Sequence, residues 1–336
     1  MDCKYCNSTN VIKFGTHTDI NGIEIQRYYC KDCLRKFTAL DTLPKMKTPM
    51  NEISSALNMY YAGMPIDGIQ RQIQQEYNHS ISEPSIYGWI TRFTKEAITK
   101  ERNFRPDVGD IWVADETVLN IGGKNVWFWD IIDTKSRYLL ATHISLARNM
   151  EDAQILVEKA INKAGKFPKT IITDKLRAYI DGIELGSKGK AQHIRSKPFT
   201  DVNSTNMIER FHGILKQRTN VIHHFKDLNT ARLLTEGWLI HYNFFKDHES
   251  LNNESPAKHM KLDMPFNDWD DVVRNTNVYE PAVVMFGKDK PFHRPSTPQQ
   301  KHDAYMRAAV RKSVAKKRKA EQKPSASIQS ARLKKK

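Results

Sequence analysis

The spacing of hydrophobic and polar positions changes along the chain and predicts its elements. Three runs rich in Val, Ile, Trp, Phe, Leu and Tyr predict three consecutive strands. They are residues 111–119, 126–132 and 137–146. Gly122-Gly123 predicts the turn between the first two strands, and the polar stretch 133–137 predicts the next turn. A sheet is therefore expected to begin near residue 111.

Helical spacing of apolar residues follows in residues 149–164. Residues 170–173 form a short apolar run that predicts a buried strand, and a Gly- and Lys-rich loop then leads to a candidate strand at 192–194. Two further helices are predicted at about 204–216 and 229–245. Together these elements predict an α/β layer fold of the ribonuclease H type.

Residues 50–100 show helical periodicity in three pieces, at about 50–62, at about 66–77, and from Ser82, which would be the N-cap of the third. Three short helices with a tight second turn are typical of a helix-turn-helix unit that binds DNA. Five positions of the third helix would then face the major groove. These are Ser85, Tyr87, Gly88, Arg92 and Lys95. The alternative is a helical hairpin that packs on the next domain.

All four cysteines lie in the first 33 residues, as two C-x2-C pairs separated by 23 residues. They are Cys3, Cys6, Cys30 and Cys33. Two such pairs predict four thiolate ligands on one tetrahedral Zn²⁺, and Asn21-Gly22 predicts a hairpin turn between them, as in a zinc ribbon. Disulfides are the alternative, and His17 is a conceivable substitute ligand that is better explained as a surface residue.

Charge and hydropathy narrow the class of protein. The net charge is +15, and residues 305–336 carry 12 Lys or Arg against one acidic residue, which indicates contact with a polyanion such as nucleic acid. The alternative for this tail is a solvated segment without a dedicated ligand. No apolar run reaches the ~20 residues that span a bilayer, and residues 1–10 lack the apolar stretch of a secretory signal, so we expect a cytoplasmic protein without membrane contact.

Three acidic residues carry the candidate chemistry. Asp115 lies in a predicted strand, Asp174 directly follows the strand 170–173, and Glu209 lies in the helix 204–216. There are 58 residues between the first and second acids and 34 between the second and third. Carboxylate oxygens are preferred ligands of Mg²⁺, and two ions about 3.5–4 Å apart can hold the attacking and leaving oxygens of a phosphoryl transfer.

Several neighbouring residues have other predicted roles. Glu116 should point to the opposite face of its strand from Asp115, so only one of the two is expected to face the site. Lys216 follows Glu209 by seven residues on nearly the same helical face and is a candidate for contact with a DNA phosphate; Arg210 and His212 are weaker candidates. Four other acids are interpreted as turn, strand-face or loop residues: Asp130, Asp133, Asp181 and Asp201.

These motifs resemble those of DDE transposases of bacterial and archaeal insertion sequences, in the retroviral integrase superfamily, and are most similar to the insertion-sequence-six group. The similarity covers about residues 1–260 and rests on YYCKDCLRKFT, IWVADETVL, IITDKLRAY, NMIERFHGILKQRTNVIHHFKDL and HYNFFKDHESLNNESPAKHM. The basic tail is not part of the pattern.

The resemblance implies a DNA transposase in which Asp115, Asp174 and Glu209 hold two Mg²⁺ ions, or Mn²⁺. Such an enzyme cleaves double-stranded DNA at the element ends and joins the freed 3′-hydroxyls to target DNA by direct transesterification, without a covalent protein–DNA intermediate. Two ends must be held together, so a homodimer or larger assembly on DNA is expected. The alternative is a DNA-binding regulator, derived from a transposase, that uses only the zinc ribbon and the helix-turn-helix unit.

The predicted organisation has four parts. They are a zinc ribbon at 1–45, a helix-turn-helix unit at 46–105, a ribonuclease H-like catalytic domain at 106–265, and an irregular, strongly basic tail at 266–336.

Overall fold

The computed structural model describes residues 1–18, 24–44, 46–121, 123–196, 206–221, 227–277 and 282–284. The chain divides into two compact units, Met1–Met285 and Phe286–Lys336. The second unit lies outside the described residues, as do the predicted turn at Asn21-Gly22 and the predicted helix start at Ser204. The predictions for those segments therefore stay predictions.

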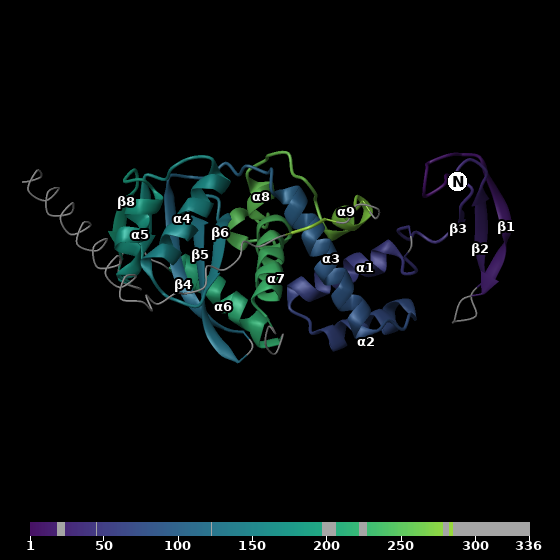
Figure 1. Cartoon of the computed structure of the whole chain (residues 1–336), viewed down its shortest axis with the longest axis horizontal. Coiled ribbons are helices and arrows are strands. Elements are labelled where there is room, and N and C mark those ends of the chain that lie inside the picture. Colours follow the sequence, from purple (N-terminus) through teal and green to yellow (C-terminus); the bar gives the residue numbers. More distant parts are fainter. Residues whose placement is uncertain are drawn as a thin grey trace, which may run out of the picture. The chain divides into compact units, whose positions relative to one another are not determined.

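The largest sheet has five strands in the order β6-β5-β4-β7-β8 (Figure 1). Their bounds are β4 Ile111–Ile121, β5 Lys124–Asp133, β6 Leu139–Ser145, β7 Thr170–Thr173 and β8 Gln192–Arg195. The first three are antiparallel, whereas β7 pairs with β4, and β8 with β7, in parallel. Three antiparallel strands extended by two parallel ones give the mixed sheet of a ribonuclease H-like fold, as the sequence predicts.

Helices pack on this sheet and form one buried core with it. They are α4 Met150–Ala164, α5 Ala178–Gly186, α6 Asn206–Val221 and α7 Leu228–Ile240. The start of α4 is fixed by a capping box, in which the Asn149 side chain accepts from the Asp152 amide and the Asp152 carboxylate accepts from the Asn149 amide. Gly165, with a φ of 69°, ends the helix in the left-handed region that glycine favours.

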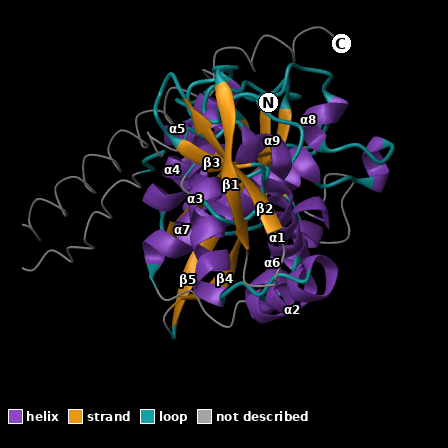
Figure 2. Ribbon diagram, turned by 90° about the vertical axis from the view of Figure 1, so that its right-hand side faces the viewer, coloured by secondary structure: helices purple, strands orange, loops and turns teal. Residues whose placement is uncertain are grey.

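The helix α5 corrects the sequence analysis, which placed a loop after Asp174 and treated Asp181 as a loop residue. Figures 1 and 2 show α5 beside α4, and two glycines explain the close approach. A Cβ added to Gly182 would lie 2.6 Å from the Cβ of Ala153, and one added to Gly186 would lie 2.9 Å from the Cβ of Val157. Glycine lowers helix propensity, but here it allows the two helices to touch.

Replacing Gly182 by alanine is expected to lower the free energy of unfolding by about 1–3 kcal/mol, because the added methyl group overpacks the α4–α5 contact. The matched control is Gly88→Ala in another helix, where an added Cβ meets no atom of the described chain within 4 Å. There the gain in helix propensity should stabilise the protein by up to about 1 kcal/mol. Chemical denaturation measures both; equal effects at the two sites would contradict the packing role of Gly182.

The helices predicted in residues 50–100 are present with the expected bounds, as α1 Met50–Ala62, α2 Ile66–Tyr77 and α3 Glu83–Glu101. Their buried residues belong to the same hydrophobic cluster as the core of the five-stranded sheet. A close approach occurs at Gly237 of α7, where an added Cβ would lie 2.6 Å from Thr94 Cγ2 on α3 and still closer to the Tyr61 hydroxyl on α1. The three helices therefore pack on the next segment as well as on one another.

The helix predicted at 229–245 is α7 continued by a π-helical turn, His241–Phe245. This turn places the Asn243 amide against the edge of the sheet, where it accepts from the Leu139 amide at 2.8 Å and donates to the Leu139 carbonyl at 2.9 Å. Two short helical segments follow, Glu249–Leu251 and α8 Pro256–His259.

The helix α9, Trp269–Arg274, corrects the prediction of irregular structure from residue 266 onward. Six residues are too few for a helix to be stable alone, so packing must hold it. The Asp268 carboxylate caps it by accepting from the Asp271 amide, and Trp269 is fully buried with its ring stacked 4.9 Å from that of Tyr61. Tertiary burial, which local composition does not reveal, decides its structure.

The N-terminal sheet has the order β1-β2-β3, with β1 Val11–Thr18, β2 Glu24–Cys30 and β3 Lys36–Thr38. Its buried residues form a separate small cluster of Cys3, Cys30 and Phe37. Among the described helices, none is long and apolar enough to cross a membrane.

Candidate active site and zinc site

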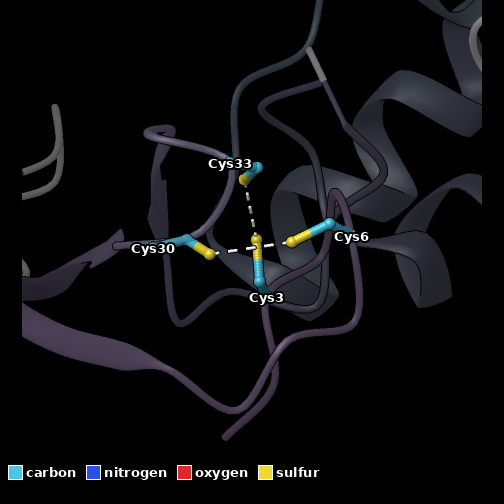
Figure 3. A group of neighbouring side chains, drawn as sticks. All are labelled: Cys3, Cys6, Cys30 and Cys33. Carbon is cyan, nitrogen blue, oxygen red and sulfur yellow. Dashed lines mark hydrogen bonds between the residues drawn. The ribbon is translucent and has the colours of Figure 1, made fainter.

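The four cysteine side chains converge from the two C-x2-C turns (Figure 3). Their Sγ atoms all lie within 4.8 Å of one another, with 3.5 Å between Cys3 and Cys33 and 3.6 Å between Cys6 and Cys30. Four sulfurs at about 2.3 Å from a central zinc would stand ~3.8 Å apart, whereas a disulfide requires ~2.05 Å. All four cysteines are free, so the geometry fits Zn²⁺ and not the disulfide alternative.

The thiols have unequal acidity. Hydrogen bonds from backbone amides, first that of Cys33, lower the pKa of Cys30 to about 7, whereas desolvation by burial raises the pKa of Cys33 to about 12. Neighbouring thiolates repel one another unless a cation lies between them. His17 is exposed on β1, as the sequence analysis expected of a surface residue.

A second cluster combines three carboxylates, those of Asp115, Glu116 and Asp174, whose ligand oxygens all lie within 4.8 Å of one another. Asp115 and Glu116 lie on β4, and Asp174 directly follows β7. The pairing of β4 with β7 ends at Val113 and Ile172, so the edge of β4 is open at the two acids. Asp174 is oriented by its own backbone, since its Oδ1 accepts from the Leu176 amide at 2.8 Å.

Glu116 was expected to point away from the site, and its place in this cluster corrects that expectation. The side chains of Asp115 and Glu116 point to opposite faces of the strand. Both still lie near Asp174, because no strand pairs with this edge of β4 at the two acids among the described residues. The Glu116 side chain is 1% exposed and pairs with the Arg148 guanidinium, which lies 4.4 Å from the Trp127 ring centroid. Its Oε2 is buried and has no partner that meets hydrogen-bond geometry among the described residues, although the Tyr179 hydroxyl lies near the carboxylate and lowers its pKa. An acceptor of this kind fits a bound cation.

Burial is the main electrostatic feature of the cluster. Desolvation raises the pKa of Asp115 to about 7, although the nearby His212 lowers it and the carboxylates of Asp130 and Glu116 raise it further. Desolvation also raises the pKa of Glu116, against the effect of Arg148. Crowded carboxylates that are hard to ionise are the donor set that a divalent cation stabilises in its charged form. The acids therefore fit a hard metal ion such as Mg²⁺ or Mn²⁺.

The helix α6 carries the third acid of the predicted triad. Glu209 is half-buried there and stands outside the tight group of oxygens formed, among the described residues, by Asp115, Glu116 and Asp174. One turn later His212 faces that group, with its Nδ1 3.6 Å from Asp115 Oδ2. Glu209 thus lies on a helix that contacts the cluster through His212, and the three residues of the predicted triad lie on β4, after β7 and on α6.

Residues 109–248 match the protein family described as DDE domain. The match contains the carboxylate cluster and Glu209. Residues 109–248 are a DDE domain. The chain is 24% identical over 173 residues to an uncharacterized protein of Methanocaldococcus jannaschii. This alignment covers 48% of this chain and 69% of that protein.

Solved structures similar to the chain include retroviral integrases. The HTLV-2 integrase catalytic core in complex with magnesium has 16% identity and a TM-score of 0.36, over 46% of this chain and 99% of that one. The simian T-cell lymphotropic virus intasome has 14% identity and a TM-score of 0.38, over 70% and 79%. The BIV integrase core has 13% identity and a TM-score of 0.36, over 46% and 94%.

The candidates for DNA contact in the DDE domain fall into two groups. Arg210 and Lys216 are exposed on α6 and are free to approach a phosphate. His212 is 6% exposed, with its Nε2 2.6 Å from Asp130 Oδ1, so its assignment as a weaker DNA contact is wrong. A signal for this was present in the sequence, because His212 shares the helical stripe of three buried residues, Ile208, Phe211 and Leu215.

On α3, outside the DDE domain, Ser85, Tyr87 and Gly88 are exposed as expected, whereas Arg92 and Lys95 are half-buried. The Arg92 guanidinium lies 3.8 Å from the Met46 sulfur and 5.6 Å from the Phe93 ring centroid. The exposed face of α3 is therefore concentrated in its first two turns.

Glu116 lies in the DDE domain but was set aside by the alternation of its strand. Replacing it by glutamine is expected to weaken Mn²⁺ binding by about tenfold or more, since loss of ligands or their close partners typically costs 10–100-fold in metal affinity. The matched control is Glu151→Gln, an exposed acid at the start of α4 that should change nothing. Isothermal titration calorimetry measures the Mn²⁺ affinity of both variants. An unchanged affinity in Glu116→Gln would show that Glu116 pairs with Arg148 but does not contribute to metal binding.

Proposed function

We propose that the protein is a DNA transposase that cleaves element ends and joins the freed 3′-hydroxyls to target DNA by two-metal transesterification. The observation that carries the proposal is the carboxylate cluster of Asp115, Glu116 and Asp174 inside the DDE domain. These acids combine burial with crowding, which fits a divalent cation better than it fits free carboxylates. DNA transposition is the activity to which a DDE transposase domain points.

In this proposal Asp115, Asp174 and Glu209 hold the metal ions, and Glu116 adds a further carboxylate. Bound Mg²⁺ or Mn²⁺ would supply an activated water or 3′-hydroxyl and stabilise the leaving 3′-oxygen. The protein's own residues fix the positions of these ligands. Asp115 is held by a central strand, Asp174 by its bond from the Leu176 amide, and Glu209 by the packed helix α6.

DNA contact is assigned to exposed cationic and polar residues. Lys216 and Arg210 on α6 would hold phosphates near the scissile bond, because they are exposed on the helix that carries Glu209. The first turns of α3, with Ser85 and Tyr87, would contact the element end in the major groove. Arg92 and Lys95 would contribute at the edge of this surface. We propose domain boundaries at residues 45, 105 and 265 from the changes in sequence pattern along the chain.

The assembly follows from the reaction. Two element ends have to be joined to one target, so the active species would be a homodimer or larger assembly on double-stranded DNA. Zinc would hold the N-terminal ribbon through its four cysteines.

The experiment is a strand-transfer assay with labelled element-end duplexes and a supercoiled plasmid in Mg²⁺. Joined product that depends on the metal supports the transposase. Cleaved but unjoined DNA would indicate a nuclease instead. Tight binding without cleavage or joining would favour the regulator derived from a transposase.

A further inference from the structure

His212 occupies a buried position between two acids of different strands. Its Nε2 lies 2.6 Å from Asp130 Oδ1 on β5, and its Nδ1 lies 3.6 Å from Asp115 Oδ2 on β4. Asp115 and Asp130 are directly opposite each other in the β4–β5 pairing. One ring on α6 therefore contacts a cross-strand pair of carboxylates.

Both ring nitrogens face carboxylate oxygens, one on each of two neighbouring strands. The contact with Asp130 is a short hydrogen bond, whereas the 3.6 Å separation from Asp115 is a close approach that is too long for one. Asp130 is fully buried, and among the described residues its Oδ2 accepts no hydrogen bond. A buried carboxylate is tolerated when a cation or donor compensates its charge, and His212 is the side chain placed to do so.

The contact also links two parts of the proposed catalytic centre. His212 lies three residues after Glu209, one turn further along α6. Through His212, the helix that carries Glu209 is connected to the strand that carries Asp115. The same Asp115 carboxylate has an oxygen within 4.8 Å of ligand oxygens of Glu116 and Asp174, so His212 contacts a member of the cluster directly.

We propose that His212, held from behind by Asp130, is a positioning residue that orients Asp115 for the metal and sets the separation of Asp115 from Glu209. This inference rests on the proposed two-metal function. It follows the general behaviour of residues behind metal ligands, which orient the ligands and whose loss lowers metal affinity. The competing explanation is that the ring only fills space and pairs Asp130.

The test is Mn²⁺ binding by isothermal titration calorimetry, with the full zinc-loaded chain and the variant His212→Gln. We expect the affinity to fall about tenfold or more, as for other residues behind metal ligands. The matched control is His143→Gln, which removes another part-buried His–Asp pair, of His143 Nε2 with Asp152 Oδ1 at 3.1 Å, neither of which belongs to the acid cluster. That variant should lose some thermal stability and keep the affinity of the wild type.

If His212→Gln does not fold, Asp130→Asn serves as the second variant, because it keeps an acceptor for the ring and removes only the charge behind it. A decrease in Mn²⁺ affinity for either folded variant supports the inference. Wild-type affinity in a folded variant that melts at lower temperature would overturn it and leave a packing role. Absence of Mn²⁺ binding by the wild type itself would overturn the proposed function, so the two failures are distinguishable.

Discussion

Replacing Asp174 by asparagine is expected to abolish strand joining in Mg²⁺, with a decrease in rate of about a thousandfold or more. The physical reason is the loss of one carboxylate from a cluster whose oxygens lie within 4.8 Å of one another. A metal ion contributes several kcal/mol to stabilising a phosphoryl-transfer transition state, and each ~1.4 kcal/mol corresponds to a factor of ten in rate. An amide oxygen has nearly the same shape but carries no charge to balance the ion.

The matched control for this prediction is Asp181→Asn. Asp181 is an exposed acid on α5, seven residues after Asp174, and does not belong to the cluster. Gel analysis of labelled end DNA should show wild-type joining for this variant. Joining by Asp174→Asn at the rate of the wild type would remove Asp174 from the catalytic centre, whatever the outcome for Asp115 and Glu209.

Removal of zinc is expected to unfold residues 1–45 and to leave the DDE domain folded. Among its described residues the N-terminal sheet has a buried cluster of Cys3, Cys30 and Phe37 with a few partly buried neighbours, which is too small to stabilise it without a metal. In zinc-finger peptides the metal contributes about 10–16 kcal/mol of apparent binding free energy, which becomes folding free energy. A strong chelator, or Cys6→Ser, should therefore expose this segment to limited proteolysis without shifting the main thermal transition.

His17→Ala is the control for the zinc prediction, because His17 is exposed on β1 and is not among the four clustered ligands. It should retain one zinc per chain by mass spectrometry under native conditions. A chain that is free of zinc but resistant to protease, and that loses this resistance on addition of a reducing agent, would indicate disulfides in place of the metal.

The helices and strands with a regular spacing of apolar residues could be predicted from the sequence, because that spacing shows which face of each element is buried. The helices α1 and α2 and the strand β7 have the predicted bounds. The helix α4 begins one residue after the predicted start at Asn149, which is its N-cap. Elements held by contacts distant in sequence were missed. The glycines of α5 lower its helix propensity but allow contact with α4, and α9 is held by the burial of Trp269.

In the candidate site, too, some residues could be predicted from the sequence pattern and others depend on contacts that only the fold creates. Asp115 and Asp174 were predicted from their places in and after a strand, and they lie together. Glu116 was excluded by the alternation of side chains, which holds within a paired strand but does not exclude contact around an open edge. His212 was judged by residue type alone; its position on the apolar stripe of α6 predicts burial, but only the fold shows that Asp115 and Asp130 meet it there.

The helix α3 has a consequence for where DNA would be cut. Its 19 residues extend over about 28 Å at 1.5 Å per residue, with the exposed turns at its start and a firmly held end. At that end Glu101 accepts from the Tyr138 hydroxyl at 3.0 Å and pairs with Lys163 of α4. A duplex bound at the first turns of α3 would thus contact a helix whose other end is fixed to the catalytic core. The length of α3 would therefore fix the distance in base pairs between the recognised sequence and the cleaved bond, so the protein and not the DNA would determine this distance.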